Sequence, residues 1–264
     1  MSEPEYVCPV CQSQLTRQGK SYICPNRHTF DIARSGYVNL SRRQKPAGDN
    51  KEMVRARTEF LEKGYYAPLR DKVCETVGSA DVLADIGCGQ GYYTGRLPAR
   101  TRYGFDLARE ALVHAARTDK DTHYCLASIY DIPLKEESVD TVTSIFTPLP
   151  AAEVVRLLKK EGRLIQVLPG PDHLKELKEL LYDSVYLNPD TVPEAEGLHI
   201  VDVQRLTWKQ NVSDIWDLFE MTPYRYRSPA QGIQRVKEAR SLEITFDFYI
   251  VQRKRKEILD NDAA

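Results

Sequence analysis

The chain has 264 residues, of which 42% are hydrophobic and 28% are charged, and its formal net charge is −1. This length allows one large domain, or one domain with a small module, and the composition is ordinary for a protein with a substantial core. No run approaches the ~20 apolar residues of a membrane span, and the first residues lack the features of a secretory signal. We therefore expect a cytoplasmic protein with reduced cysteines and no membrane partner.

A metal-binding pattern opens the chain. Cys8 and Cys11 are separated by two residues, and Cys24 and His28 by three. Three thiols and one imidazole match the Cys3His sets of structural zinc sites, in which all four positions around the ion are filled. About thirty residues cannot bury enough apolar surface to fold alone, so a metal would supply the missing stability. A redox Cys-x2-Cys is disfavoured because no thioredoxin-like unit surrounds Cys8.

The charge is unevenly distributed along the chain. Residues 1–48 carry seven basic and three acidic side chains, about +4, which leaves about −5 for the remainder. Such a basic head suits an anionic partner, but a solvated surface explains it equally well. Periodicity ends after Leu40, and residues 41–50 have the composition of a linker. We predict a zinc module in residues 1–40, a linker in 41–50 and a second domain in 51–264.

Helical and strand patterns alternate through the second domain. Alternation of this kind predicts a parallel sheet with right-handed crossovers. With the last two strands close to a hairpin pairing, the pattern predicts an α/β, Rossmann-like class I methyltransferase fold with a seven-stranded, mostly parallel sheet. The expected strands are 82–86, 101–106, 122–128, 138–146, 162–169, 199–208 and 241–252. The expected helices are two within 51–77, one after the first strand, and 109–118, 151–159, 172–184, 213–220 and 229–240.

A glycine-rich turn follows the first of these strands. Such a turn lets the backbone approach a nucleotide ligand, but alone it does not separate S-adenosylmethionine from NAD. An acid opens the turn, which suits a sulfonium or an amino group, and a second acid ends the next strand, where a carboxylate can bind ribose hydroxyls. A structural turn and an NAD site stay open as alternatives. The candidate cofactor residues from this pattern are Asp85, Gly87, Gly89, Gln90, Gly91, Asp106 and Ser128.

Several segments together resemble one family, the bacterial 23S rRNA (guanine-N1)-methyltransferases. The segments are "CPVC", "YICPNRH", "FDIARSGYVNL", "RARTEFLEKGYYAPLRD", "DIGCGQGYYT" and "PGPDHLKELKELLY", which span residues 8 to about 182, and "LFEMTPY" at 218–224. The glycine loop alone is unspecific, whereas the order of these segments is highly specific. The resemblance covers both the cysteine-rich head and most of the second domain.

The resemblance implies structural zinc at Cys8, Cys11, Cys24 and His28, and S-adenosylmethionine as cofactor. It implies cofactor contacts at Tyr66, Gly89, Gln90 and His173, of which Tyr66 and His173 are not expected from spacing alone. From the residues alone, Tyr66 suits a core aromatic equally well, and His173 suits a helix cap or a surface position. The resemblance also implies a homodimer whose basic cleft grips a 23S rRNA hairpin, with the zinc module as part of the clamp.

The implied chemistry requires a proton acceptor that the sequence does not identify. Guanine N1 carries a proton, so methylation there calls for a general base, and the base must leave its stack. After the fourth strand, residues 146–150 read Phe-Thr-Pro-Leu-Pro, without the acid or amide of many N-methyltransferases. His173 is a weak candidate for the base, and the catalytic residue stays unassigned. The alternatives are a zinc-bearing RNA-binding protein with a vestigial cofactor pocket, and a methyltransferase with a non-RNA substrate.

Overall fold

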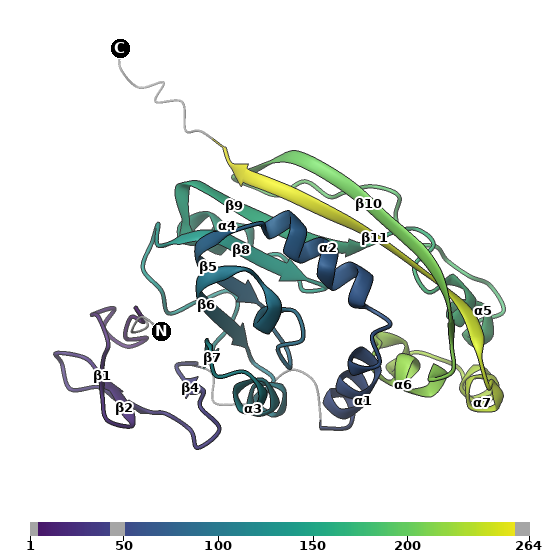
Figure 1. Cartoon of the computed structure of the whole chain (residues 1–264), viewed down its shortest axis with the longest axis horizontal. Helices are drawn as coiled ribbons and strands as arrows, with labels where there is room; N and C mark the ends of the chain where they lie inside the picture. Colours follow the sequence, from purple (N-terminus) through teal and green to yellow (C-terminus); the bar gives the residue numbers. More distant parts are fainter. Residues whose placement is uncertain (1–4, 43–50, 257–264) are drawn as a thin grey trace, which may run out of the picture.

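The computed structural model describes residues 5–42 and 51–256, which form a small N-terminal module and a larger α/β domain (Figure 1). The module contains β1 (Thr16–Gln18), β2 (Ser21–Ile23), β3 (Thr29–Asp31) and β4 (Val38–Asn39). The first three strands form an antiparallel sheet of their own. Most of the expected linker, residues 43–50, lies outside the described ranges.

The larger domain alternates strands and helices in its first two thirds and ends in a long hairpin. Its strands are β5 (Ala80–Ile86), β6 (Ala99–Asp106), β7 (Thr122–Leu126), β8 (Val139–Ile145), β9 (Leu158–Pro169), β10 (Leu198–Val212) and β11 (Leu242–Arg255). Its helices are α1 (Lys51–Glu62), α2 (Ala67–Val77), α3 (Arg109–Thr118), α4 (Ala151–Leu157), α5 (Lys175–Leu181), α6 (Ile215–Glu220) and α7 (Ala230–Glu238), with 3-10 turns η1 (Thr94–Arg96) and η2 (Pro223–Tyr226).

The main sheet has the order β10-β11-β9-β8-β5-β6-β7-β4. Strands β5 to β9 pair in parallel, whereas β11 runs antiparallel to both β9 and β10. From β5 onward, the chain therefore starts at the centre of the sheet, runs through β6 and β7 towards one edge, and returns past the centre to the other edge. This confirms the predicted mostly parallel sheet and the hairpin of its last two strands. The carboxyl ends of β5 and β8 meet at the point where the strand order reverses, which is where such sheets bind ligands.

The predicted count of seven strands is one too low. The eighth strand is β4, which pairs in parallel with the outer edge of β7, Val38 beside Cys125 and Asn39 beside Leu126. Its two residues are too short to produce a strand period in the sequence. The pairing is stabilised because Val38 and Leu40 are buried, and it covers part of an edge that would otherwise expose unpaired backbone groups.

The helix expected directly after the glycine turn is also absent, and only the three-residue η1 stands there. Gly95 and Pro98 explain the difference, because glycine is a poor helix former and proline cannot continue a helix. The later helix expected at 172–184 begins only at Lys175, since Leu174 has a left-handed backbone with φ +57°. Both short elements leave irregular backbone at the carboxyl edge of the sheet.

The N-terminal module packs directly onto the edge of the larger domain, beside β7 in Figure 1. Tyr6 is buried, its ring meets Tyr103 edge-on at 5.6 Å, and its hydroxyl donates to the His123 carbonyl. The backbone N–H of Val7 donates to the carbonyl of Pro133 at 3.0 Å. One buried cluster runs from the cysteines of the module into β5 and β6, so the two parts share a core.

No helix in residues 5–42 or 51–256 is long and apolar enough to cross a membrane.

Candidate metal and cofactor sites

The four predicted metal ligands converge in the N-terminal module. The Sγ atoms of Cys11 and Cys24 are 3.6 Å apart, and His28 Nδ1 lies 3.5 Å from Cys8 Sγ and 3.3 Å from Cys24 Sγ. All four ligand atoms lie within 4.8 Å of one another. The corners of a tetrahedron around zinc are roughly 3.5–3.8 Å apart for Zn–N and Zn–S bonds of about 2.0 and 2.3 Å. The four side chains therefore fit zinc, and they fill every position of a structural site.

Local backbone structure holds the second pair of ligands in place. The N–H of Arg27 donates to the carbonyl of Cys24 at 2.9 Å, which closes a tight turn between Cys24 and His28. The N–H of His28 also points at Cys24 Sγ, at 3.3 Å. This contact helps to fix the position of the Cys24 sulfur. Cys8 and Cys24 are buried, so water has little access to the ion from their side.

The glycine turn after β5 lies against the turn after β8. A Cβ on Gly87 would lie 2.0 Å from the Thr147 hydroxyl oxygen, and its φ is +72°, so only glycine fits. A Cβ on Gly89 would meet nothing within 4 Å, so open space adjoins the loop there. The backbone thus comes close to its neighbour on one side and leaves room for a ligand on the other.

Asp106 ends β6, as predicted, and its carboxylate also binds the glycine turn. Its Oδ2 accepts from the Gly89 N–H at 2.8 Å and its Oδ1 from the Ala108 N–H at 2.7 Å. The Asp106 carbonyl accepts from the Ala127 N–H, which brings Ser128 to the same edge of the sheet. A carboxylate at this position can accept hydrogen bonds from a ribose diol.

Gln90 provides an independent indication of a ligand. Its side chain is buried, and its Nε2 has no hydrogen-bond partner among the described residues. A buried amide donor without a partner is costly, and most such groups in native proteins are satisfied. Gln90 directly follows Gly89 in the turn, and a polar cofactor bound there, such as the predicted S-adenosylmethionine, would offer this donor an acceptor.

Asp85 lies beneath the turn rather than in the open space. It is buried, and its two oxygens accept from Thr94 Oγ1 at 2.5 Å and Thr143 Oγ1 at 2.8 Å. Burial raises the pKa of Asp85 to about 6, against the lowering effect of the two hydroxyls. The carboxylate therefore supports the turn from below.

We expect Asp85→Asn to stabilise the cofactor-free protein increasingly as pH rises. In the unfolded chain this carboxyl ionises near pH 4, whereas in the folded protein it ionises at about 6, so ionisation costs stability across that interval. Two pKa units correspond to about 3 kcal/mol, which the neutral amide avoids. Urea unfolding at pH 4 and pH 7 measures the free energy of unfolding of both proteins. If the difference between the variant and the wild type is the same at the two pH values, the prediction is wrong.

Tyr66 and His173 come together from distant parts of the chain. Tyr66 is the last residue before α2, His173 precedes α5, and Tyr66 Oη lies 3.5 Å from His173 Nε2. Both side chains are buried, and both rings pack against Phe248 of β11, at centroid distances of 5.6 Å for Tyr66 and 4.5 Å for His173. They lie near the turn after β8, since Phe146 touches both rings.

The environment of His173 disfavours a role as general base. Burial, with a contribution from the Lys178 charge, lowers the pKa of His173 to about 3. A group with so low a pKa is a weak proton acceptor at neutral pH. The Asp247 N–H approaches Nδ1 at 3.4 Å, which assigns the ring proton to Nε2, on the side of Tyr66. His173 is therefore a neutral residue that orients its neighbours.

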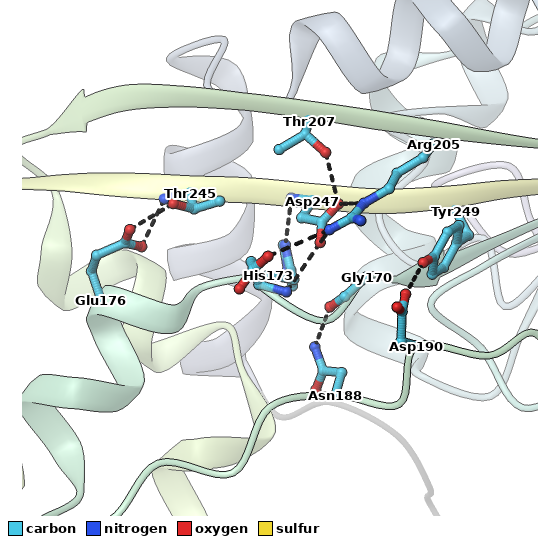
Figure 2. Close-up of polar contacts among 11 residues, drawn as sticks. Gly170, His173, Glu176, Asn188, Asp190, Arg205, Thr207, Thr245, Asp247 and Tyr249 are labelled. Carbon is cyan, nitrogen blue, oxygen red and sulfur yellow. Dashed lines mark hydrogen bonds and ion pairs between the residues drawn. The ribbon is translucent and has the colours of Figure 1, made fainter.

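The network that holds His173 was not foreseen from the sequence. Arg205 of β10 donates through Nε and Nη2 to the two oxygens of Asp247 of β11, each at 2.8 Å (Figure 2). Asp247 also accepts from Thr207 Oγ1 and from the Asp172 N–H, and its carbonyl accepts from the Gly170 N–H. The network thus fastens residues 170–173 to the hairpin. The only sequence feature that could have indicated this network is an acidic residue, Asp247, within the apolar run of β11.

Sheet topology, glycine turn and ribose-side acid together define a class I, S-adenosylmethionine-dependent methyltransferase. Residues 84–166 match the family model described as "Methyltransferase domain", and residues 6–45 match the one described as "RlmA, N-terminal", a zinc ribbon. The metal cluster and the cofactor edge described above lie within these two matches or next to them.

Relatives identify the family. The chain is 34% identical over 268 residues to a Bacillus subtilis protein provisionally named 23S rRNA (guanine-N1)-methyltransferase YxjB, covering 92% of this chain and 95% of that protein. It is 35% identical over 186 residues to the 23S rRNA (guanine(748)-N(1))-methyltransferase of Streptomyces fradiae, covering 66% of each chain. The chain belongs to the family of 23S rRNA (guanine-N1)-methyltransferases.

Similarity in the methyltransferase domain alone is less specific. The human arginine-hydroxylase NDUFAF5 is 29% identical over 130 residues, which cover 46% of this chain and 38% of that protein. Its name gives a different activity, so the domain alone does not define the reaction. The zinc ribbon and the alignment over nearly the whole chain carry the family assignment. They confirm the resemblance seen in the sequence, the fold class, the cofactor and the structural zinc, whereas the individual cofactor contacts stay predictions.

Proposed function

We propose that this protein transfers a methyl group from S-adenosylmethionine to N1 of a guanine in a hairpin of 23S rRNA. The observation that carries the proposal is the joint presence of a zinc ribbon and a class I methyltransferase sheet, aligned over 92% of the chain with a relative of that name. We further propose that it acts in the cytoplasm as a homodimer, the form that the family resemblance implies.

Each of the expected cofactor residues would contact a different part of S-adenosylmethionine. When bound, S-adenosylmethionine supplies an electrophilic methyl group on a sulfonium. Asp106 would accept the ribose hydroxyls, Ser128 would line the adenine side, and the unpartnered Gln90 amide would find an acceptor. Tyr66 and His173 would close the site on the side of the hairpin. These packed aromatic residues exclude water from the reaction, which strengthens electrostatic contacts there.

The zinc ribbon would present positive charge to the RNA. Arg17 in β1 and Lys20, Arg27 and Arg34 in the turns between or after the short strands are exposed on its surface, and bound zinc would fix the backbone that carries them. RNA hairpins are recognised largely by shape, by phosphates and by splayed bases. Binding through such contacts weakens steeply with salt, because each phosphate contact releases counterions.

The test is methyl transfer to 23S rRNA that lacks the modification. Purified protein is incubated with labelled S-adenosylmethionine and the RNA, which is then digested to nucleosides for mass spectrometry. We expect labelled 1-methylguanosine, and we expect Asp106→Ala to reduce its formation about 10–100-fold, the effect of losing one or two hydrogen bonds to a charged group.

Other outcomes would favour the alternatives. Binding of RNA and cofactor without any labelled nucleoside would favour an RNA-binding protein with a vestigial cofactor pocket. Label on a protein or on a small molecule, but not on RNA, would favour a methyltransferase of another substrate class.

A further inference from the structure

Phe146 has an unusual conformation at the carboxyl edge of the sheet. It directly follows β8, its side chain is 43% exposed, and its φ of +56° is left-handed. Bulky residues rarely adopt this conformation, and those that do cluster at ligand-binding and catalytic sites. The Phe146 N–H donates to the Val167 carbonyl at 3.3 Å, which helps to fix the backbone. The fold thus holds an aromatic ring partly in solvent at the end of a central strand.

Part of the Phe146 ring is packed against other rings. Phe248 lies at a centroid distance of 5.4 Å, and Tyr66 meets the ring edge-on at 6.3 Å. The His173 ring is almost parallel to that of Phe146, with 14° between the planes and 6.3 Å between the centroids. Three neighbours therefore set the orientation of the Phe146 ring, while its exposed portion is uncovered by the residues that the structure describes.

The ring lies next to the expected methyl donor. Thr147 follows Phe146 and stands so close to the glycine turn that a Cβ on Gly87 would lie 2.0 Å from its hydroxyl oxygen. Strands β5 and β8 are hydrogen-bonded neighbours, with Ile86 opposite Ser144, so their two turns leave the sheet side by side. An acceptor that approaches the cofactor over this edge would therefore meet Phe146.

The chemistry of this turn favours stacking over side-chain hydrogen bonding. Residues 146–150 contain neither a carboxylate nor an amide, so no side chain of that kind in this turn can bind the edge of a base. An exposed aromatic ring binds the flat face of a base, and splayed RNA bases are commonly held in this way. The turn therefore suits a planar, unstacked nucleobase.

We propose that the acceptor guanine, once it has left its RNA stack, stacks on the exposed part of the Phe146 ring. This inference rests on the proposed function and assigns a residue of that site to the substrate. Phe146 holds the base, and Tyr66, His173 and Phe248 hold Phe146.

The test compares Phe146→Leu, Phe146→Ala and Phe146→Trp with the wild type. Leucine keeps apolar bulk but has no ring, whereas tryptophan keeps a stacking surface. We measure single-turnover methyl transfer to 23S rRNA, and separately the binding of S-adenosylmethionine and of RNA. The free energy of stacking a base on one aromatic residue corresponds to a change of roughly 10–100-fold in rate or affinity. We expect the leucine and alanine variants to lose about that factor in rate, with both affinities within about twofold, and the tryptophan variant to recover most of it.

Tyr186→Ala provides the matched control, since this aromatic residue is 87% exposed and lies outside the site. We expect it to retain the wild-type rate. A leucine variant with the wild-type rate would overturn the proposal, as would a loss of cofactor affinity that accounts for the whole effect. A folding defect in the alanine variant leaves the leucine and tryptophan pair to decide. Failure of the wild type to form 1-methylguanosine is a separate result, which rejects the proposed function itself.

Discussion

Replacing Cys24 with serine should release zinc, unfold the N-terminal module and abolish methylation of 23S rRNA. Cys24 Sγ lies within 3.6 Å of two of the other ligand atoms, and binding of structural zinc contributes on the order of 10 kcal/mol to the folding of such modules. The effect should extend into the main sheet, because the module contributes β4 and shares a core with β5 and β6. Zinc content by mass spectrometry and hydrogen exchange across residues 6–42 measure both consequences.

Cys74→Ser is the matched control for this experiment. Cys74 lies in α2, outside the metal cluster, and its thiol donates to the Arg96 carbonyl, a bond that a serine hydroxyl can replace. We expect this variant to keep about one zinc per chain, as a single four-ligand site requires. A Cys24→Ser protein that keeps a protected module and full activity would show that the metal is dispensable.

Replacing Arg205 with leucine should destabilise the protein by about 2–3 kcal/mol and weaken binding of S-adenosylmethionine. The Asp247 side chain is fully buried, and loss of the cation leaves its charge uncompensated, which costs about 3–5 kcal/mol in a fully buried pair and less here because Arg205 is 42% exposed. Residues 170–173 would lose their anchor, and His173 with them. Chemical denaturation and calorimetric titration with the cofactor measure the two effects.

The stability that the Arg205–Asp247 pair contributes should depend on pH. Burial raises the pKa of Asp247, but hydrogen bonds from Arg205 and Thr207 outweigh it and hold the net pKa below its usual value. The stability that the pair contributes is therefore present above about pH 4, the unfolded value, and is lost as pH falls through the folded pKa. The difference in the free energy of unfolding between the wild type and Arg205→Leu should therefore become smaller as the pH falls below about 4.

Two variants separate the buried ion pair from general effects of charge on the same strand. Lys209→Leu removes a cation of β10 that is 59% exposed and whose pair with Glu176 is long, at 3.9 Å, so we expect a change in the free energy of unfolding below about 1 kcal/mol. Arg205→Leu combined with Asp247→Asn should recover part of the loss, because no charge then remains buried without a partner. Equal destabilisation by Arg205→Leu and Lys209→Leu would contradict the assigned role of the pair.

Signals that are local in sequence predicted the four metal ligands, and they also gave part of the expected cofactor site. The four zinc ligands lie within one short segment, and their spacing alone matches the chemistry of the ion. The glycine turn, Gln90 and Asp106 follow a strand or end one, so the period of the sheet places them at one edge. Tyr66 and His173 had no such signal, and only the family resemblance placed them near the cofactor.

By itself, the sequence determined the fold class, the metal ligands and the position of the glycine turn after β5, because each depends on residues close together along the chain. The tertiary structure alone decided that β4 joins the main sheet, that Asp85 lies beneath the turn, and that Arg205 and Asp247 fasten the segment carrying His173. Most of these contacts join residues 42 or more positions apart, whereas the one between Thr94 and Asp85 spans nine. They depend on strand order and burial, which a linear pattern does not encode.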